Sequence, residues 1–145
     1  MTDYQLTQTV IGCAMKVHSA LGPGLLESAY KECLCFELRQ GGLFVEKEKP
    51  VPLVYSDVKL GAGYRVDILV ERRLIVEVKA VAGIDDVILA QVLTYLKLAD
   101  LRLGLIFNFH VVHLRNGIRR VVNRYEDSAS SAQPSASAAV SVLED

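Results

Sequence analysis

The sequence predicts an α/β fold in which a mixed central sheet is flanked by helices. Two helical segments open the chain, and a group of strand-like runs rich in β-branched residues follows them. One more helical segment then separates this group from a last apolar strand-like stretch. Because helices and strands do not alternate regularly, the sheet should contain both antiparallel and parallel strands, in a sandwich of two or three layers.

Glycine and proline bound the helical segments. We expect a first helix over about residues 6–21, ended by Gly22-Pro23-Gly24, and a second over about residues 26–40, ended by Gly41-Gly42. A third helix is expected over about residues 86–98. The side chains expected to face inward from the second helix are Ala29, Cys33, Phe36 and Leu38.

Short runs of β-branched and aromatic residues mark the strands. Before the third helix, strands are expected at about residues 44–49, 51–55, 63–70 and 74–80, and an apolar strand is expected after it at about residues 103–109. A run at 111–114, the turn Asn116-Gly117 and a run at 118–122 predict a closing hairpin.

The composition separates one domain from a tail. Of the 145 residues, 51% are hydrophobic and 23% are charged, which is typical of a soluble globular protein. We expect residues 1–126 to form the domain and the Ser/Ala-rich residues 127–145 to be disordered, since that stretch is poor in bulky apolar side chains. Residues 1–126 carry 16 basic and 14 acidic side chains, so their net charge of +2 attracts nucleic acid only weakly.

The cysteines and the N-terminus predict a cytoplasmic protein. Cys13, Cys33 and Cys35 are odd in number and lack metal-site spacing, as expected of thiols in a reducing compartment. The N-terminal residues lack the basic start of a signal peptide, and no apolar run has the length of a membrane span.

Charged residues interrupt two neighbouring strand-like runs. Asp67 lies in one run, and Glu77 and Lys79 lie in the next. If the runs pair around the loop Glu71-Arg72-Arg73, the period-two alternation of a strand places Asp67 opposite Glu77, with Lys79 on the same face as Glu77. The apolar residues expected on the other face are Val66, Ile68, Val70, Val76 and Val78.

Opposed carboxylates need a counter-charge. The β-carbons of directly opposed residues lie about 5 Å apart, and two carboxylates so placed repel by about 3–4 kcal/mol at an effective dielectric of about 20. Mg²⁺ takes oxygen ligands and is commonly held by one or two carboxylates and by substrate phosphates. Asp67, Glu77 and Lys79 therefore indicate a metal-dependent site for phosphodiester cleavage. The alternative is an exposed ladder of charged pairs, each worth about 0.2–1 kcal/mol.

Three further residues are candidates for the same site. Gln91 and Tyr95 are four residues apart on the third helix, so they share a face, distinct from that of its apolar residues, and can reach the cleft beside Glu77. The alternative is a solvated stripe with a tyrosine at its rim. Glu27 starts the second helix, where the helix dipole stabilises an acid, and it could also direct a carboxylate at metal-bound water.

The motif Gly24-Leu-Leu-Glu27-Ser-Ala-Tyr30 stands together with characteristic blocks at 64–70, 75–80, 90–96, 104–109 and 119–123. These blocks resemble the GxxExxY family, a branch of the PD-(D/E)XK nuclease superfamily, over about residues 9–123. The motif's proline is Val66 here, at a position that supplies no ligand. The resemblance implies a restriction-endonuclease-like fold with an αβββαβ core, in which a mixed central sheet is flanked by helices.

The resemblance also implies roles for the candidate residues. Asp67, Glu77 and the backbone carbonyl of Val78 would be metal ligands, and Glu27 would be a further ligand or would assist the attacking water. Lys79 would orient or activate that water and stabilise the phosphorane charge. Gln91 and Tyr95 would position the substrate and the catalytic lysine. The implied cofactor is Mg²⁺, with Mn²⁺ as a substitute.

The resulting hypothesis is a Mg²⁺-dependent nuclease acting on DNA, in repair or defence. The alternative is a nucleic-acid-binding or protein-interaction module that keeps the fold and does not cleave; the joint presence of Asp67, Glu77 and Lys79 favours the nuclease. The weak positive charge favours DNA ends, single strands or a substrate delivered by a partner over long duplexes. A homodimer or a partner protein is expected, and no membrane association.

Overall fold

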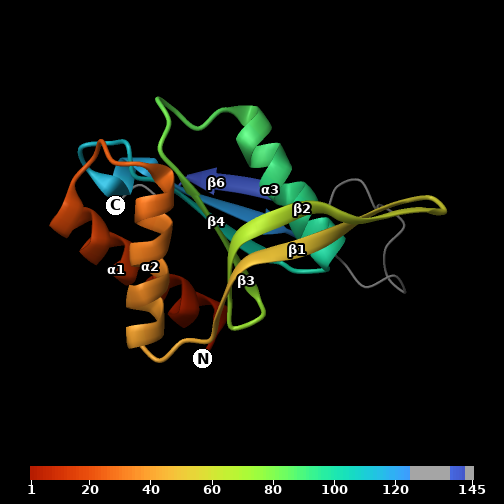
Figure 1. Cartoon of the computed structure of the whole chain (residues 1–145), viewed down its shortest axis with the longest axis horizontal. Coiled ribbons are helices and arrows are strands. Elements are labelled where there is room, and N and C mark those ends of the chain that lie inside the picture. Colours follow the sequence, from red (N-terminus) through yellow and green to blue (C-terminus); the bar gives the residue numbers. More distant parts are fainter. Residues whose placement is uncertain (125–137, 143–145) are drawn as a thin grey trace.

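Within residues 1–124 and 138–142, which the computed structural model describes, six strands form one mixed sheet covered by helices (Figure 1). In chain order the elements are α1 (Asp3–Leu21), α2 (Glu27–Gln40), β1 (Val45–Tyr55), β2 (Val58–Val70), β3 (Leu74–Lys79), α3 (Asp86–Ala99), β4 (Leu103–Asn108), the 3₁₀ helix η1 (Leu114–Gly117), β5 (Ile118–Asn123) and β6 (Ala138–Val142). The stretch from α2 to β4 has the predicted αβββαβ order. The α/β class, with a mixed sheet flanked by helices, is confirmed and is consistent with a restriction-endonuclease-like fold.

The strands lie across the sheet in chain order, from β1 to β6. β3 and β4 are parallel, in a register that aligns Lys79 with Asn108, and the other neighbouring pairs are antiparallel. Because a parallel pair needs a long crossover connection, a helix is required between these two strands, and α3 supplies it. The carboxyl ends of β3 and β4 therefore lie at the same end of the sheet, where Lys79 ends its strand.

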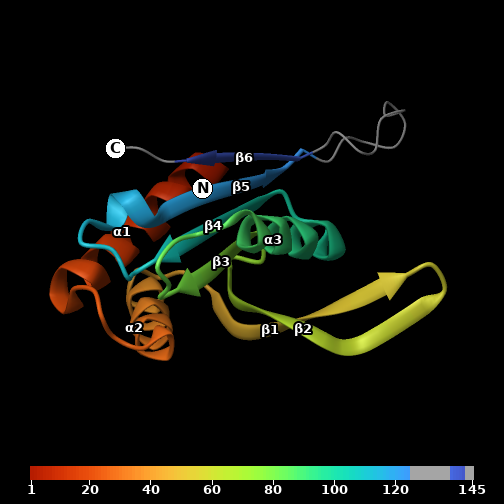
Figure 2. The same cartoon turned by 90° about the horizontal axis from the view of Figure 1, so that it is seen from above.

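β1 and β2 form a long antiparallel hairpin whose tip extends away from the rest of the molecule (Figure 1 and Figure 2). The sequence predicts two separate runs at 44–49 and 51–55, but β1 is continuous through Pro50. Because β1 is an edge strand, the missing N–H of Pro50 can fall on the side that has no neighbouring strand.

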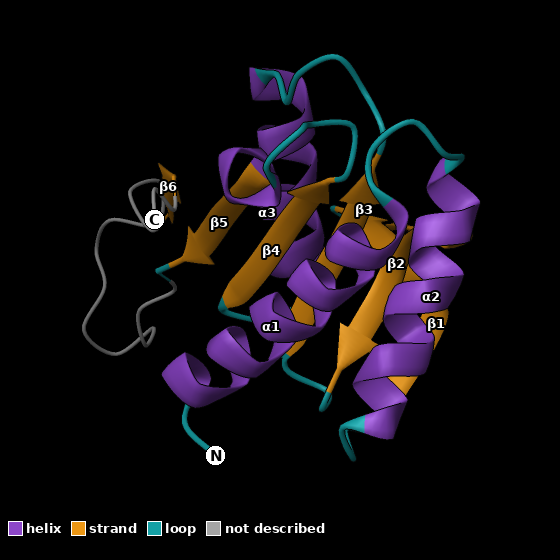
Figure 3. Ribbon diagram, turned by 90° about the vertical axis from the view of Figure 1, so that its left-hand side faces the viewer, coloured by secondary structure: helices purple, strands orange, loops and turns teal. Residues whose placement is uncertain are grey.

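Helices on both faces make the molecule a three-layer sandwich (Figure 3). α1 and α2 cover one face of the sheet, over an apolar cluster that includes Ile68, Val76 and Phe107. α3 covers the other face, over a second cluster that includes Ile75 and Ile106. Both faces of the central strands are thus buried, and this explains why β3 and β4 are almost continuously apolar in sequence.

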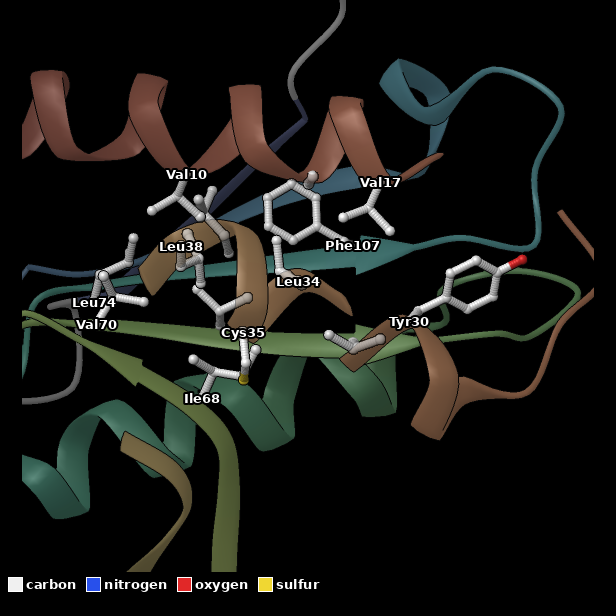
Figure 4. Packing of buried hydrophobic residues seen from close by; sticks show 14 of the residues in the cluster. Val10, Val17, Tyr30, Leu34, Cys35, Leu38, Ile68, Val70, Leu74 and Phe107 are labelled. Carbon is white, nitrogen blue, oxygen red and sulfur yellow. The ribbon is translucent and has the colours of Figure 1, made fainter. Parts of the chain in front are cut away.

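The buried face of α2 differs from the predicted one. Tyr30, Leu34, Cys35 and Leu38 are buried and pack into the core (Figure 4). Phe36, which was expected to face inward, is 57% exposed. The buried positions follow an i, i+4, i+5, i+8 pattern, so the helical period and not the size of the apolar side chain decides which residues turn inward.

Side chains cap the ends of the first and third helices. Thr2 and Gln5 form a reciprocal capping box at the start of α1, which ends at Gly22 with a positive φ of 69°. Asp85 caps α3 by accepting a hydrogen bond from the N–H of Ile88 at 2.9 Å. In the part of the chain that the structure describes, no helix is both long enough and apolar enough to cross a membrane.

The predicted closing hairpin between 111–114 and 118–122 is wrong. Residues 114–117 form η1, and β5 pairs antiparallel with β4 instead, with Phe107 opposite Ile118. β5 can form more backbone hydrogen bonds with the edge of the apolar strand β4 than with the short run at 111–114. A methyl group on Gly117 would lie 2.4 Å from the carbonyl oxygen of Asn108, so this close return of the chain requires glycine.

The expectation of a disordered tail over residues 127–145 needs correction in one place. Residues 138–142 form β6, which pairs antiparallel with β5 from Asn123 opposite Ala138 to Arg119 opposite Val142. The outer edge of β5 presents unpaired backbone donors and acceptors, and a short extended run can form hydrogen bonds with them. The remaining tail positions, 127–137 and 143–145, lie outside the described residues.

Tyr30 fixes the connection between α1 and α2. Its buried ring stacks on Phe109, with ring centroids 4.5 Å apart and planes 8° apart. Its hydroxyl donates to the carbonyl of Gly22 at 2.5 Å and accepts from the N–H of Leu25 at 3.1 Å. The N–H of Phe109 donates to the carbonyl of Lys79 at 2.9 Å, so the same contacts support the end of β3.

We expect Tyr30→Phe to lower the free energy of unfolding by about 1–2 kcal/mol, because the backbone groups of Gly22 and Leu25 lose their shared partner. Urea denaturation of the full chain measures the change. The matched control is Tyr4→Phe, at a tyrosine that is 68% exposed, which should stay within about 0.5 kcal/mol of the wild type. Equal stability of the Tyr30→Phe variant and the wild type would contradict the proposed role of the hydroxyl.

Candidate functional site

The hairpin of β2 and β3 has the register that the sequence predicts. The pairs are Ile68 with Val76, Leu69 with Ile75 and Val70 with Leu74, around the loop Glu71-Arg72-Arg73. Glu71 and Arg72 have positive φ of 53° and 56°, which allows this odd-numbered loop to reverse the chain. The next positions outward along the two strands are Asp67 and Glu77.

Beyond the last backbone pair of β2 and β3, the hydrogen bonds between the strands run from backbone N–H groups to side-chain carboxylates. The N–H of Asp67 donates to Oε2 of Glu77 at 2.9 Å, and the N–H of Val78 donates to Oδ2 of Asp67 at 2.8 Å. Each carboxylate therefore accepts a backbone hydrogen bond from the opposite strand. Such bonds to charged acceptors are short and strong, and they fix the two acids side by side.

Glu77 is a buried acid within an apolar strand. Its side chain is buried, and the residue is only 4% exposed. Burial raises the pKa of Glu77 to about 8, together with the negative charge of Asp67, while the charge of Lys79 acts in the opposite direction. With such a pKa, the carboxyl group keeps its proton at neutral pH in the absence of a further positive charge.

Lys79 is half-buried at the end of β3, on the same face as Glu77. The chain beyond it is fixed by Asn108, its neighbour in β4. Asn108 accepts from the N–H of Val81 at 3.1 Å and donates to the carbonyl of Val81 at 3.0 Å. Asn108 could not be selected as a supporting residue from the sequence, because a single asparagine at the end of an apolar run has many possible roles.

α3 brings Tyr95 to the site but leaves Gln91 exposed. Tyr95 is 7% exposed. Its pKa is raised mainly by burial and further by the negative charges of Glu77 and Asp67. Its ring lies 6.2 Å from that of Tyr64, at an angle of 47°. The expectation that Tyr95 lies on a face separate from the apolar residues of α3 is wrong, because Val92, three positions earlier, packs in the same cluster.

Two residues that the sequence analysis did not select complete the surroundings of Asp67. Nζ of Lys31, on α2, lies 3.3 Å from Oδ1 of Asp67 and forms an ion pair with Glu48 of β1. These partners raise the pKa of Lys31, although burial by itself would lower it. The signal for Glu48 was present in the sequence, since an antiparallel pairing of β1 with β2 that aligns Val45 with Val70 places Glu48 opposite Asp67.

The strand alternation of β2 also shifts at Asp67. Ile68 and Val70 face α1 and α2 as predicted, but Val66 packs in the cluster under α3. The prediction that Val66 shares their face is therefore wrong. At the opposite position, Glu48 has a positive φ of 56°, and such an irregularity interrupts the pleat of paired strands.

Glu27 is not joined to the two strand acids. It is the first residue of α2 and is partly exposed, in the first helical turn where the dipole favours an acid. Among residues 1–124 and 138–142, no group of three His, Cys, Asp or Glu side chains is close enough to hold a metal ion. The structure therefore brings together Asp67, Glu77, Lys79 and Tyr95, and leaves Glu27 and Gln91 at a distance from direct contact.

A cavity of about 530 Å³ lies elsewhere, between the end of α1 and the segment before η1. The polar side chains in its lining include His18, His113 and Arg115, and the lining does not include Asp67 or Glu77. We place the candidate site at the acids rather than at this cavity, because two neighbouring acids, one of them buried with a raised pKa, are typical of functional sites.

The sequence comparisons identify the family of the chain. A family model described as the PD-(D/E)XK nuclease superfamily matches residues 4–121, which include α1 through most of β5 and all the candidate residues. No curated protein and no solved structure matches the chain. Since the matched region covers most of the 145 residues, the chain belongs to the PD-(D/E)XK nuclease superfamily.

Proposed function

We propose that this protein is a metal-dependent nuclease that hydrolyses phosphodiester bonds, with DNA as its substrate. The observation that supports this most directly is the pair of acids on β2 and β3, Asp67 and Glu77, which exchange backbone hydrogen bonds beside Lys79. Membership of a nuclease superfamily supports the same activity. The motif from Gly24 to Tyr30 further supports a place in the GxxExxY branch.

The donor set fits a hard divalent cation. Asp67, Glu77 and the carbonyl of Val78 offer only oxygen atoms, the ligands that Mg²⁺ and Mn²⁺ prefer. The raised pKa of Glu77 fits as well, because it comes first from burial and then from the negative charge of Asp67, and a bound cation would offset both effects. When bound there, Mg²⁺ would polarise the phosphate and lower the pKa of a coordinated water.

The side chains around the acids have separate proposed roles. Lys79 orients the attacking water and stabilises the negative charge that develops on the phosphate, from its place beside Glu77. Tyr95 positions the substrate. It also excludes water from Glu77, since both residues are buried. Gln91 is proposed to contact substrate from its exposed position on α3, and Glu27 to assist the water from the start of α2.

The charge of the domain limits the substrate. Residues 1–126 have a net charge of only +2, and affinity for duplex DNA depends largely on neutralised phosphates. We therefore propose DNA ends or single strands, or DNA delivered by a partner or by a second copy of the chain, as the substrate. A cytoplasmic role in repair or defence is consistent with the free cysteines Cys13, Cys33 and Cys35.

One observation favours the alternative of a module that keeps the fold and does not cleave. Lys31 already neutralises Asp67 through a contact of 3.3 Å, which reduces the need for a bound cation at that carboxylate. Measurements of cleavage and of metal binding separate the two functions.

For cleavage, we expect metal-dependent degradation of at least one substrate among linear, circular and single-stranded DNA and RNA. Lys79→Ala should reduce the rate by about 10²–10⁴-fold, the usual contribution of a side chain that assists proton transfer. The matched control is Lys16→Ala, because Lys16 is an exposed lysine on α1 whose partner is Glu37. If both variants cleave at the wild-type rate, the activity does not come from this site.

For metal binding, isothermal titration calorimetry with MgCl₂ and MnCl₂ should show a site in the wild type. We expect Asp67→Asn to weaken binding at least about tenfold, because it removes a charged oxygen ligand and keeps the side-chain size. The control is Asp57→Asn, at an exposed acid in the turn between β1 and β2. Binding that is equal in all three proteins would place the metal elsewhere.

For pH dependence, the metal-free protein should become less stable as the pH rises from about 5 to about 8. The folded state, with Glu77 at a pKa of about 8, keeps a proton that the unfolded chain releases near its ordinary pKa of 4.5. The free energy of unfolding should therefore fall by up to about 1.4 kcal/mol per pH unit from this group. Urea denaturation with a chelator at several pH values measures this slope, and Glu77→Gln should remove it. An unchanged slope in Glu77→Gln would assign the effect to other groups.

A further inference from the structure

A lysine ammonium occupies the space between two carboxylates from neighbouring strands. Lys31 extends from α2, and its Nζ lies 3.3 Å from Oδ1 of Asp67 and in an ion pair with Oε2 of Glu48. The side chain of Lys31 is only 15% exposed and that of Asp67 only 17%. Because a lysine is rarely buried without a partner, these acids account for its position.

The backbone of β1 is distorted so that Glu48 can take part. Glu48 has a φ of 56° in the middle of a strand, a left-handed conformation that is unfavourable for a residue with a side chain. Lys47 and Glu48 are consecutive, yet both contact α2, through Glu32 and Lys31. In a regular strand two consecutive side chains point to opposite faces, so the distortion turns Glu48 to the side of Lys31.

The carboxylate of Asp67 cannot bind the ammonium of Lys31 and a divalent metal ion at the same time without repulsion between the two cations. Two positive charges about 4 Å apart repel each other strongly near a protein surface, and a divalent ion doubles the repulsion. A metal ion at Asp67 would therefore drive the ammonium of Lys31 away from that oxygen. Glu48, with its side chain 39% exposed, remains available to hold the displaced ammonium near the surface.

We propose that Lys31 is a built-in counter-cation that competes with the divalent metal for Asp67, and that Glu48 holds Lys31 when the metal binds. This inference rests on the proposed metal site at Asp67 and Glu77. Lys31 and Glu48 are positioning residues, which set the affinity for the metal without contacting it. In the metal-free protein, Lys31 keeps Asp67 fixed in its hydrogen bond with Val78.

The two substitutions should change metal affinity in opposite directions. In calorimetric titrations of the full chain with MgCl₂ and MnCl₂, Lys31→Met should lower the Kd about tenfold or more, because the competitor is gone. Glu48→Gln should raise the Kd several-fold, because Lys31 then has only Asp67 as a partner. The matched control is Lys47→Met, which breaks the neighbouring ion pair between β1 and α2 and should leave the Kd unchanged.

Thermal unfolding with a chelator and with MgCl₂ gives a second readout. Lys31→Met should unfold at a lower temperature than the wild type without metal, because Asp67 is left unpaired, and should gain more from MgCl₂. Lys31→Gln, which keeps a hydrogen-bond donor and removes the charge, serves if Lys31→Met does not fold. A double variant separates the role of Glu48: adding Glu48→Gln to Lys31→Met should have no further effect on the Kd.

The outcomes separate this inference from the proposed function. Asp67-dependent binding in the wild type that is not tightened by Lys31→Met or Lys31→Gln overturns the inference and leaves the metal site in place. A further loss of affinity on adding Glu48→Gln to Lys31→Met overturns the role of Glu48, which would then act as a ligand. Absence of metal binding in the wild type and in both Lys31 variants overturns the inference together with the metal-dependent function.

Discussion

Two hydrogen bonds across the end of the β2–β3 hairpin hold together two groups that repel each other. The N–H of Asp67 reaches the carboxylate of Glu77, and the N–H of Val78 reaches the carboxylate of Asp67. Without these bonds, like charges at opposed positions of a sheet would turn apart toward solvent. Because the backbone enforces their proximity, the surrounding structure must supply positive charge or a proton, and the chemistry of the site follows from that requirement.

The requirement is met differently on the two sides of the sheet. On the side of α2, Lys31 bridges Asp67 and Glu48. On the side of α3, Tyr95 is buried near enough to the acids for their charges to raise its pKa, and burial raises the pKa of Glu77. The site thus lies where β2 and β3 separate, between helices from opposite layers.

The sequence was sufficient for features that depend on short-range periodicity. The alternation of apolar and charged residues, combined with an odd loop, gave the correct register of Asp67 and Glu77. Sequence reasoning failed where two segments could pair with the same strand, or where packing against the sheet selected the buried face of a helix. The run at 111–114 had a plausible turn beside it, yet β5 pairs with β4, whose apolar edge is longer. Phe36 is exposed because the helical period fixes which residues of α2 share a face, while packing on the sheet selects the face that is buried.

By itself, the sequence determined the α/β class, the αβββαβ order from α2 to β4 and the pairing of the two strand acids, because alternation, turn length and helix stop signals act over a few residues. Only the tertiary structure decided that Lys31, and not Glu27, reaches Asp67, and that Glu77 is buried beside Tyr95. Lys31 is 17 residues from Glu48 and 36 from Asp67 in the chain. Contacts of that separation depend on how α2 packs against the sheet and on a strand distortion at Glu48, neither of which local patterns encode.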